Sequence, residues 1–185
     1  MPYMILIAGI SGTGKTTYAR HIADKLHIPF IGKDNIKEKL YDVLQYDTEK
    51  QGNSQLYGAA SYSVFFHIAE CLMKADISFV LESNFTLSSV EVLAPLAQKY
   101  KYHTLTVLLD ADMETLDKRI QERDATAERH PGLKLPSGQY IPLNFNCANY
   151  RNFCIGEKII IDTTDFTKVS YSEIDDLVID FIERV

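Results

Sequence analysis

The chain alternates between short apolar runs and longer stretches in which apolar and polar residues mix. The run 3–8 predicts a buried strand, because it is brief and ends at a glycine. Similar runs predict strands at residues 30–32, 77–81, 102–109 and 158–161. The longer stretches predict helices at residues 16–26, 35–44, 54–74, 88–100, 114–123 and 172–182.

Strands that alternate with long helices indicate βαβ units, and therefore a parallel sheet with helices on both faces. One side of the first helix carries Tyr18, Ala19, Ile22 and Leu26. Ser172 is the expected N-cap of the last helix. Ligands of open parallel sheets bind beyond the carboxyl ends of the strands, so we expect functional residues just after each strand.

Residues 124–142 depart from this alternation. They are polar, show no apolar period and contain Pro131, Pro136 and Pro142. Segments of this kind are usually functional lids or disordered loops. We expect a lid here, within a single domain over residues 1–185.

The composition is that of an ordinary globular chain, because 46% of its 185 residues are hydrophobic and 24% are charged. The net charge of −6 disfavours a broad nucleic-acid-binding face but allows a local basic cleft. Cys71, Cys147 and Cys154 lack metal-ligand spacing and predict reduced thiols. The chain lacks a signal-peptide pattern and an apolar run of about 18 residues, so we expect a cytoplasmic protein without a membrane span. The sequence leaves the oligomeric state open.

Residues 9–16, GISGTGKT, match the pattern GxxxxGK followed by serine or threonine, between a predicted strand and a predicted helix. The glycines let backbone N–H groups turn toward a polyphosphate, and the helix amino terminus favours negative charge. We expect Lys15 to reach the β- and γ-phosphates as a catalytic residue, and Thr16 to bind Mg²⁺. The predicted nucleotide-binding residues of this loop are Gly9, Ile10, Ser11, Gly12, Thr13, Gly14, Lys15, Thr16 and Thr17. The alternative is a glycine-rich turn that binds nothing.

Polar side chains follow two other predicted strands. Asp34 could accept a proton from an acceptor hydroxyl or help to hold Mg²⁺, and the alternative is an N-cap of the next helix. Glu82 could bind Mg²⁺ through water or orient the acceptor, and the alternative is a solvated side chain at a sheet edge. Asn84 is a candidate hydrogen-bonding group for the acceptor.

Arg119 and Arg123 are four residues apart, so we expect them on one face of the helix that precedes the lid. Arginine suits a transferring phosphoryl group, because its planar and permanently charged fork can bond two oxygens. Arg129, on the predicted lid, is a further candidate for substrate binding. The alternative for these arginines is a place on the solvated surface.

The helix predicted at residues 54–74 is rich in aromatic side chains: Tyr57, Tyr62, Phe65, Phe66 and His67. They could wall an acceptor pocket for a neutral, ring-bearing molecule, but packing against the sheet is the favoured interpretation. His67 is interpreted as a partly buried residue without a catalytic role. A nucleoside monophosphate acceptor would need arginines near Asp34, where the chain instead has Lys33, Lys37 and Lys39.

The pieces GISGTGKTTYAR, IGKDNIKEKL, VLESNF, LLDADMETLDKRIQERD and IIIDTTD follow one another over nearly the whole chain. In these pieces the chain resembles the small P-loop kinases grouped around zeta-toxin-like, chloramphenicol-phosphotransferase-like and polynucleotide 5′-hydroxyl-kinase-like proteins. Members of this group include predicted kinases and proteins labelled AAA-type ATPases. The resemblance implies a three-layer α/β/α P-loop NTPase fold, with a five-stranded parallel sheet in the order 2-3-1-4-5 and a lid. It also implies ATP with Mg²⁺ and a hydroxyl-bearing acceptor.

The same resemblance implies roles for single residues. Asp34 falls at the position of the general base, and Lys37 falls where a basic residue often binds the acceptor. Arg119 is expected near the adenine or the phosphates, and Arg123 near the phosphates as a catalytic residue. Thr164 belongs to the loop that often borders the nucleotide base.

The sequence thus predicts an ATP-dependent phosphotransferase that moves the γ-phosphate to a hydroxyl, or a phosphate, of a small-molecule or nucleotide-like acceptor. Nucleic acid is less favoured, because relatives acting on polynucleotide ends tend to have arginine where this chain has Lys37. The strand-end carboxylate of relatives is often aspartate, where this chain has Glu82. The alternative is an ATPase switch or an NTP-dependent binding module that acts on a protein or nucleic-acid partner. Motor ATPases usually carry an Asp-Glu pair at a strand end, which none of these apolar runs has.

Overall fold

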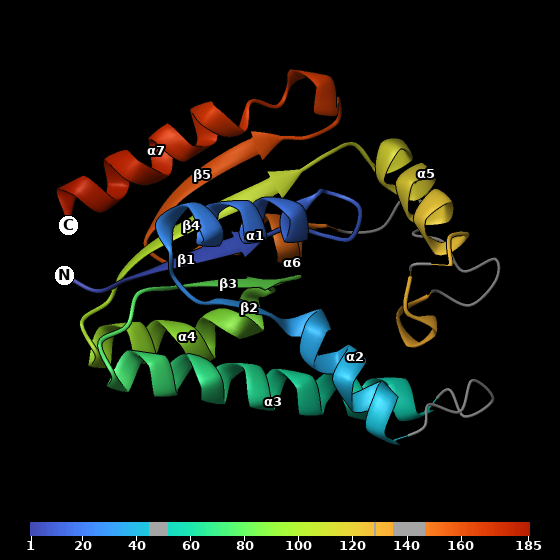
Figure 1. Cartoon of the computed structure of the whole chain (residues 1–185), viewed down its shortest axis with the longest axis horizontal. Helices are drawn as coiled ribbons and strands as arrows, with labels where there is room; N and C mark the ends of the chain where they lie inside the picture. The colour runs from blue at the N-terminus through green and yellow to red at the C-terminus, as the bar shows by residue number, and fades with distance from the viewer. Residues whose placement is uncertain (45–51, 128, 135–146) are drawn as a thin grey trace.

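Five parallel strands form the centre of the fold (Figure 1). The structure is a computed structural model that describes residues 1–44, 52–127, 129–134 and 147–185. The strands lie in the order β2-β3-β1-β4-β5. Their bounds are β1 (Tyr3–Ala8), β2 (Phe30–Gly32), β3 (Phe79–Ser83), β4 (His103–Asp110) and β5 (Glu157–Asp162). The predicted parallel sheet and its order are confirmed.

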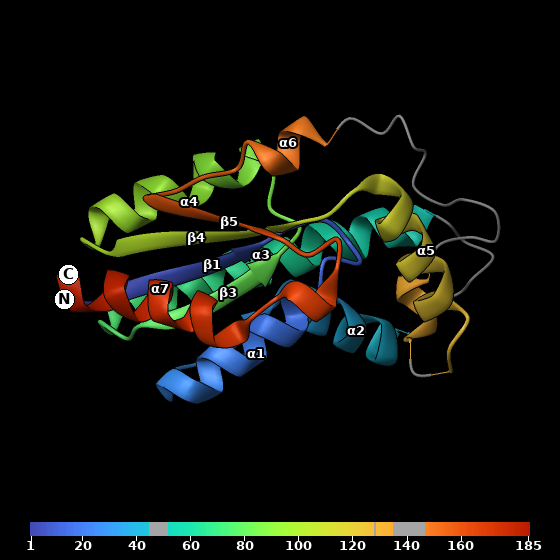
Figure 2. The ribbon, with the colours of Figure 1, turned by 90° about the horizontal axis from the view of Figure 1, so that it is seen from above.

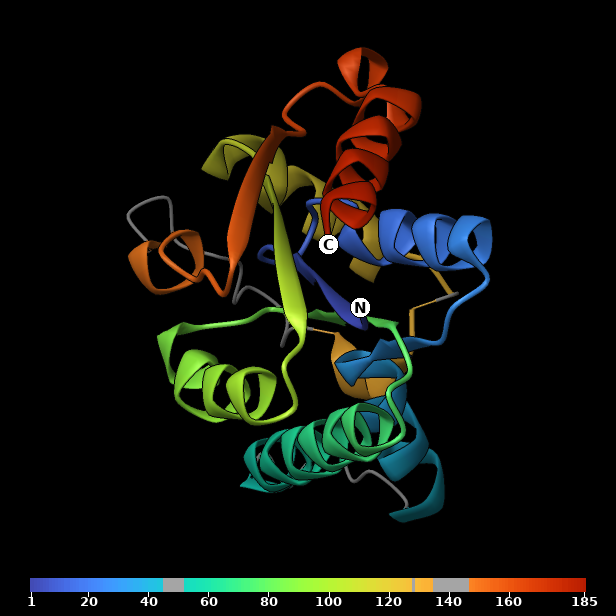
Figure 3. The same cartoon turned by 90° about the vertical axis from the view of Figure 1, so that its left-hand side faces the viewer.

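Helices cover both faces of the sheet, as the end-on view in Figure 3 shows. One face carries α1 (Lys15–Leu26) and α7 (Tyr171–Arg184), and the other carries α3 (Gly52–Lys74) and α4 (Leu87–Lys99). The helices α2 (Lys33–Leu44) and α5 (Met113–Asp124) lie at the end to which the strands point (Figure 1, Figure 2). The shorter helical segments are η1 (Pro131–Leu133), α6 (Ala148–Arg151) and η2 (Phe166–Lys168). The predicted three-layer α/β/α architecture is therefore confirmed.

Strand β1 is buried on both sides, because alternate side chains enter two different cores. Leu6 belongs to the core that includes Phe65 of α3. Ile7 belongs to the opposite core, with Tyr18 of α1 and Val178 of α7. A parallel strand covered on both faces needs such a continuous apolar run. This packing fixes the point at which the glycine-rich loop leaves the sheet.

The start of β3 differs from the prediction. Ile77 donates its backbone N–H to the carbonyl of Leu72 at 3.1 Å and so belongs to the turn that ends α3. The strand consequently begins at Phe79 instead of residue 77 and includes Glu82. Apolar character alone extended the predicted strand too far toward the amino terminus.

All six predicted helices begin one or two residues earlier than predicted, and two of these differences change the interpretation of a residue. Ser170 caps α7, because its hydroxyl accepts a hydrogen bond from the Glu173 N–H at 3.3 Å. The prediction that Ser172 is the cap was therefore wrong. Helix α2 begins at Lys33, so Asp34 lies inside its first turn instead of before it.

The predicted lid, residues 124–142, is described only at 124–127 and 129–134. In the described part, η1 packs on α2: Gly132 is buried against Tyr41, and the His130 ring stacks on Tyr41 with centroids 5.7 Å apart. Residue 128 and residues 135–142 of the predicted lid lie outside the described residues.

The cysteines and the helices agree with two further expectations. Cys71, Cys147 and Cys154 all have free thiols. Within the described ranges, none of the helices combines the length and the apolar content that crossing a bilayer requires.

Candidate active site

The glycine-rich loop joins β1 to α1 and adopts a backbone that few residues tolerate. Gly9, Gly12 and Gly14 have φ angles of 148°, 90° and 84°, a region that glycine enters without steric penalty. A Cβ at Gly9 would lie 2.4 Å from the carbonyl oxygen of Leu109. The Thr13 hydroxyl ties the loop together by donating to the Ile10 carbonyl at 3.0 Å. The loop and the start of α1 thus form a glycine cradle of the kind that fits phosphate groups.

A pocket of about 380 Å³ lies over this loop, and we call it the nucleotide pocket. It is lined by Gly12, Gly14, Lys15, Thr16, Thr17, Arg119, Arg123, Arg129 and Phe166. The structure therefore brings together the loop and all three arginines singled out in the sequence. Four basic side chains around one cavity fit a polyphosphate, because each can form charge-assisted hydrogen bonds to phosphate oxygens.

Lys15 and Glu82 form a buried pair beneath this pocket. Their Nζ and Oε1 atoms are 3.6 Å apart, and the two side chains are 8% and 4% exposed. Burial lowers the pKa of Lys15, and the Glu82 charge opposes that change. Burial likewise raises the pKa of Glu82, opposed by the Lys15 charge and by a hydrogen bond with Thr16. Glu82 is therefore not the solvated side chain of the alternative interpretation.

Glu82 and Thr16 bring together side-chain oxygen atoms of the kind that Mg²⁺ binds. Their mutual hydrogen bond places the carboxylate beside the hydroxyl that the loop motif assigns to the metal. Within the described residues, no group of three or more His, Cys, Asp and Glu side chains could hold a metal. Mg²⁺ commonly binds through one or two carboxylates together with substrate phosphates, so this donor set fits the ion.

Asp34 lies beside the buried pair at the start of α2. Its Oδ1 atom is 2.5 Å from the Nζ atom of Lys33. Burial raises the pKa of Asp34, but Lys33, Lys15 and Arg129 outweigh that effect and hold the pKa below its ordinary value. Asp34 is thus an ionised carboxylate that interacts electrostatically with Lys15 of the glycine-rich loop. Apart from the adjacency of the two residues, no feature of the sequence indicated that Lys33 pairs with Asp34.

Arg119 is held at one side of the nucleotide pocket by the loop after β5. Its guanidinium carbon lies 3.7 Å from the centroid of the Phe166 ring, and Nη2 donates to the Thr164 carbonyl at 3.0 Å. Phe166 also lies directly over Gly14. Sequence reasoning missed Phe166, although it follows the Thr163-Thr164-Asp165 loop that the resemblance had indicated.

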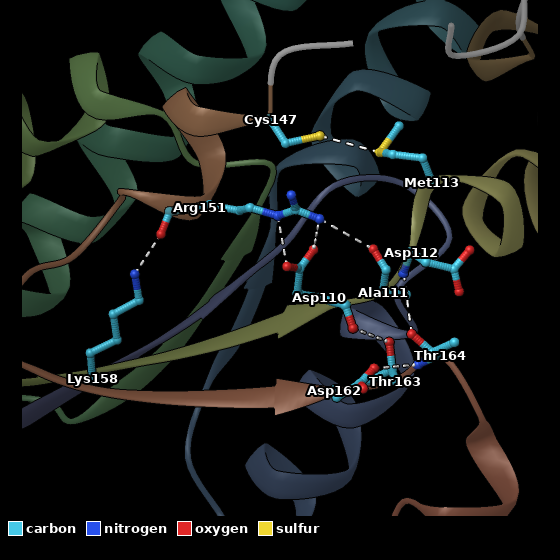
Figure 4. Close-up of polar contacts among 10 residues, drawn as sticks. All are labelled: Asp110, Ala111, Asp112, Met113, Cys147, Arg151, Lys158, Asp162, Thr163 and Thr164. Carbon is cyan, nitrogen blue, oxygen red and sulfur yellow. Dashed lines mark hydrogen bonds and ion pairs between the residues drawn. The ribbon is translucent and has the colours of Figure 1, made fainter. Parts of the chain in front are cut away.

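The Thr164 side chain has a structural task (Figure 4). Its hydroxyl accepts a hydrogen bond from the Asp112 N–H at 3.2 Å, and its N–H donates to Asp162 at 2.8 Å. These bonds join the loops that follow β4 and β5. The side chain lines a neighbouring cavity beside Asp110 and Arg151, whereas its carbonyl holds Arg119 at the nucleotide pocket.

A second and larger pocket, of about 650 Å³, lies between α3, α4 and α6, and we call it the aromatic pocket. It is lined by Lys33, Tyr62, Phe66, Asn84, Thr86, Ser88, Ser89, Glu91, Val92 and Tyr150. The predicted acceptor residue Asn84 lies here, and its Oδ1 atom is buried without a hydrogen-bond partner in the described part of the chain. Tyr150 was not anticipated, since it follows the segment read as a lid.

The aromatic side chains of α3 divide between two environments. Tyr57 and Phe65 are buried, as the favoured interpretation predicted. Tyr62 and Phe66 stack at 5.6 Å between centroids and line the aromatic pocket. His67 is exposed, with its ring 3.6 Å from the Cys71 thiol, so the expectation of a partly buried histidine was wrong.

Lys37 lies on α2 and is not among the described residues that line either pocket. Its Nζ atom is 5.4 Å from the centroid of the Tyr41 ring. Burial lowers the pKa of Lys37, the Lys33 charge adds to that change, and the Asp34 charge opposes it. Lys37 therefore interacts with Asp34 while it contacts the ring on which η1 packs.

Comparison with known proteins identifies relatives of this chain. Residues 4–134 match the family described as the AAA domain. The chain is 26% identical over 132 residues to a candidate bifunctional polynucleotide kinase/RNA ligase of Autographa californica nuclear polyhedrosis virus, covering 65% of this chain and 18% of that protein. It is 28% identical over 122 residues to a shikimate kinase of Gloeobacter violaceus, covering 66% of this chain and 64% of that protein. The chain thus spans less than two thirds of the length of either curated relative.

A solved structure extends the likeness over the whole fold. The crystal structure of a candidate kinase from Chloroflexus aurantiacus superposes with a TM-score of 0.84 and 25% sequence identity, covering 97% of this chain and 98% of that one. The predicted resemblance to small P-loop kinases and AAA-type proteins is confirmed. The chain belongs to the AAA domain family and has the fold of the P-loop kinases.

Proposed function

We propose that this protein is a kinase that transfers the γ-phosphate of ATP to a hydroxyl of a small molecule. One observation carries the proposal: the Lys33–Asp34 ion pair connects two pockets, because Lys33 lines the aromatic pocket and Asp34 interacts electrostatically with Lys15 and Arg129 of the nucleotide pocket. The likeness to a shikimate kinase supports it, because that relative is named as a kinase.

The donor side of the site provides positive charge. Lys15, Arg119 and Arg123 would bind the phosphates. Arg129 lies close enough to Asp34 to lower the pKa of that carboxyl. Such fixed charges stabilise the phosphoryl group as it moves, which is the main task in phosphoryl transfer. Mg²⁺, held by Thr16 and Glu82, would neutralise charge on the phosphate oxygens when bound.

The acceptor side provides the base. The acceptor hydroxyl oxygen forms a bond to the γ-phosphorus while the bond from that phosphorus to the oxygen of the leaving ADP breaks. The hydroxyl proton passes to the carboxylate of Asp34. Lys33, and after it Lys15 and Arg129, hold the pKa of Asp34 below its ordinary value, so this carboxylate is ionised and can accept a proton at neutral pH.

We further propose that residues 1–185 act as one kinase domain in the cytoplasm, with residues 124–142 as its lid. Arg129 supports the lid role, because it belongs to this segment and lines the nucleotide pocket. The three free thiols agree with a reducing compartment. The net charge of −6 favours a small-molecule acceptor over nucleic acid.

A transfer assay tests the proposed function. The protein is incubated with γ-labelled ATP, Mg²⁺ and a panel of nucleosides, sugars, antibiotics and 5′-hydroxyl oligonucleotides, and the label is traced. We expect labelled acceptor from the wild type, none from Lys15→Ala, and normal transfer from Lys118→Ala, which removes an exposed lysine of α5. Label released only as inorganic phosphate, at a rate that a macromolecule stimulates, would instead favour the ATPase switch.

A further inference from the structure

Lys33 and Asp34 link the aromatic pocket to the nucleotide pocket. Lys33 lines it and also contacts Asp34 at 2.5 Å. Asp34 in turn interacts electrostatically with Lys15, which lines the nucleotide pocket. A molecule in the aromatic pocket would therefore place a hydroxyl near the proposed base, Asp34. The residues that line this pocket thus indicate which class of acceptor it binds.

The two pockets differ in charge. Four basic side chains line the nucleotide pocket, whereas Lys33 is the one basic side chain among the described residues that line the aromatic pocket. The Lys33 ammonium is already paired with Asp34 and lies 5.2 Å from the centroid of the Tyr62 ring. Glu91, an exposed residue at the edge of the aromatic pocket, adds a negative charge. The lining thus offers an anionic acceptor no unengaged cation within the described part.

Arginine is the residue best suited to bind phosphate and carboxylate groups, and each arginine of the chain has a place elsewhere. Arg119, Arg123 and Arg129 line the nucleotide pocket. The others contact different parts of the fold: Arg20 stacks over Phe30, Arg151 pairs with Asp110 (Figure 4) and Arg184 pairs with Glu157. The sequence of residues 45–51, 128 and 135–146 contains no arginine. Among the described residues, therefore, no arginine lines the aromatic pocket to bind an acceptor phosphate or carboxylate. Arg129, an arginine that interacts electrostatically with Asp34, lines the nucleotide pocket.

The remaining lining combines flat apolar surface with neutral polar groups. Tyr62 and Phe66 stack on one another, and Tyr150 contributes a third ring. Aromatic faces of this kind pack against the rings or apolar faces of ligands. The Asn84 amide has an oxygen without a hydrogen-bond partner in the described residues, and the Ser88 hydroxyl keeps capacity beyond its bond to Thr86.

We propose that the aromatic pocket binds the acceptor, and that this acceptor is an uncharged hydroxyl compound with a ring or another flat apolar face. Compounds that carry a phosphate or a carboxylate beside the reacting hydroxyl are poor acceptors. The proposal rests on the proposed kinase function and names the substrate class of that same site.

Matched pairs of acceptors test the class. Nucleosides are compared with nucleoside monophosphates, alkyl glycosides with the corresponding uronides, and hydroxymethyl benzamides with hydroxymethyl benzoates, each with γ-labelled ATP. We expect phosphorylated product from uncharged members, with kcat/KM at least about tenfold above that of the anionic partner, since a charge without a partner is costly to bury. Equal or better transfer to the anionic members, or no transfer to any uncharged member, overturns the acceptor class.

Two variants test whether the aromatic pocket determines the preference for uncharged over anionic acceptors. Val92→Arg adds a cation to its lining at a side chain that is 40% exposed, and should shift the ratio of kcat/KM toward the anionic partner by about tenfold. Gln98→Arg adds the same charge at an exposed position on the same helix and should leave the ratio unchanged. Equal shifts from both variants contradict selection in this pocket.

Phe66→Ala should raise the acceptor KM about tenfold while the KM for ATP stays constant, because it removes an aromatic wall. Val64→Ala truncates an exposed side chain of the same helix and serves as the control. An unchanged acceptor KM in Phe66→Ala overturns the pocket assignment. Failure of the kinase function itself gives a different result, namely ATP hydrolysis without labelled acceptor in every variant.

Discussion

At the scale of single residues, the donor site depends on backbone shapes that only glycine adopts easily. Gly14 has a φ of 84°, and a Cβ there would lie 3.0 Å from the Phe166 ring. The ring is also the partner of Arg119, so a side chain at Gly14 would disturb the loop and the arginine together. Phosphate binding therefore rests on a contact between residues far apart in the sequence.

Gly14→Ala should weaken binding of a non-hydrolysable ATP analogue by about tenfold or more, since forcing a left-handed backbone and a tight contact costs about 1–3 kcal/mol. Isothermal titration measures the change. Gly58→Ala is the matched control, because no atom lies within 4 Å of a Cβ at this helical position. It should leave nucleotide binding intact and raise stability by up to about 1 kcal/mol. Equal nucleotide affinity in both variants would show that the loop geometry is unimportant.

Asp34→Asn should lower kcat by about 10²–10⁴-fold, as expected for loss of a general base. Binding of the ATP analogue should persist, since Lys15 and the arginines remain. Steady-state kinetics with the identified acceptor, together with analogue titration, separate the two effects. Transfer at the wild-type rate would remove Asp34 from the proposed mechanism.

The sequence anticipated those site residues that act through a local pattern. The loop motif identified Lys15 and Thr16, and strand ends pointed to Asp34 and Glu82. It missed Phe166, because the contact with Arg119 joins α5, which follows β4, to η2, which follows β5, and the two segments meet only when β4 and β5 pair. No local sequence pattern predicts a contact of this kind.

At the scale of secondary-structure elements, Asp175 fastens α7 to α1. Its carboxylate is 2% exposed and accepts hydrogen bonds from the Tyr18 hydroxyl at 3.1 Å and the Lys25 ammonium at 2.9 Å. The His21 ring lies 2.8 Å away. Burial raises the pKa of Asp175, but these partners outweigh it and hold the pKa below its ordinary value of 3.8. Because α1 follows the glycine loop, this contact also steadies the loop.

Asp175→Asn should lower the free energy of unfolding by about 2 kcal/mol near neutral pH, because charged hydrogen bonds contribute about 1.5–3 kcal/mol each and two partners are partly exposed. Since folding lowers the pKa, the stabilisation is present above 3.8 and is lost as the pH falls through the folded-state value. Urea denaturation over a pH series should therefore show the difference between variant and wild type shrinking in acid. Asp176→Asn, at an exposed position, is the control. A pH-independent difference, or an equal loss in the control, would contradict this account.

Element boundaries were predicted less well than element types. The strand β3 and the helix α7 were expected, but hydrogen bonds decided their first residues: Ile77 bonds back to α3, and Ser170 captures the Glu173 N–H. Periodicity carries no information about such competition between neighbouring elements. Because periodicity does not locate the first residue of a helix, Asp34 was predicted to precede α2, whereas it lies within the first turn of that helix.

At the scale of the whole molecule, the carboxyl edge of the sheet carries a basic pocket and a nearly neutral one side by side. The alternation of strands and helices predicted this edge as the functional one, and the resemblance implied the strand order. The sequence raised an aromatic acceptor pocket only as the less favoured interpretation of residues 54–74. It could not locate the other walls, because they come from α4 and α6, whose packing against α3 is a tertiary property.

A non-hydrolysable ATP analogue with Mg²⁺ should raise the melting temperature, because a ligand that binds only the folded state at a hundredfold excess over its Kd adds about 2.7 kcal/mol. Arg119→Ala should reduce this shift by removing a side chain of the nucleotide pocket. Lys118→Ala, which is exposed on the same helix, should retain it. An identical shift of the melting temperature in the two variants would show that the nucleotide does not bind in the nucleotide pocket.

In the proposed function, the phosphoryl group passes directly from ATP to an acceptor hydroxyl. The most direct test is the ratio of phosphorylated acceptor to ADP formed in one reaction, followed with γ-labelled ATP and the preferred uncharged acceptor. We expect a ratio near one, with ADP formation that depends on the acceptor and disappears in Lys15→Ala. A ratio near zero, with ADP formed at the same rate whether or not the acceptor is present, would contradict the proposed function.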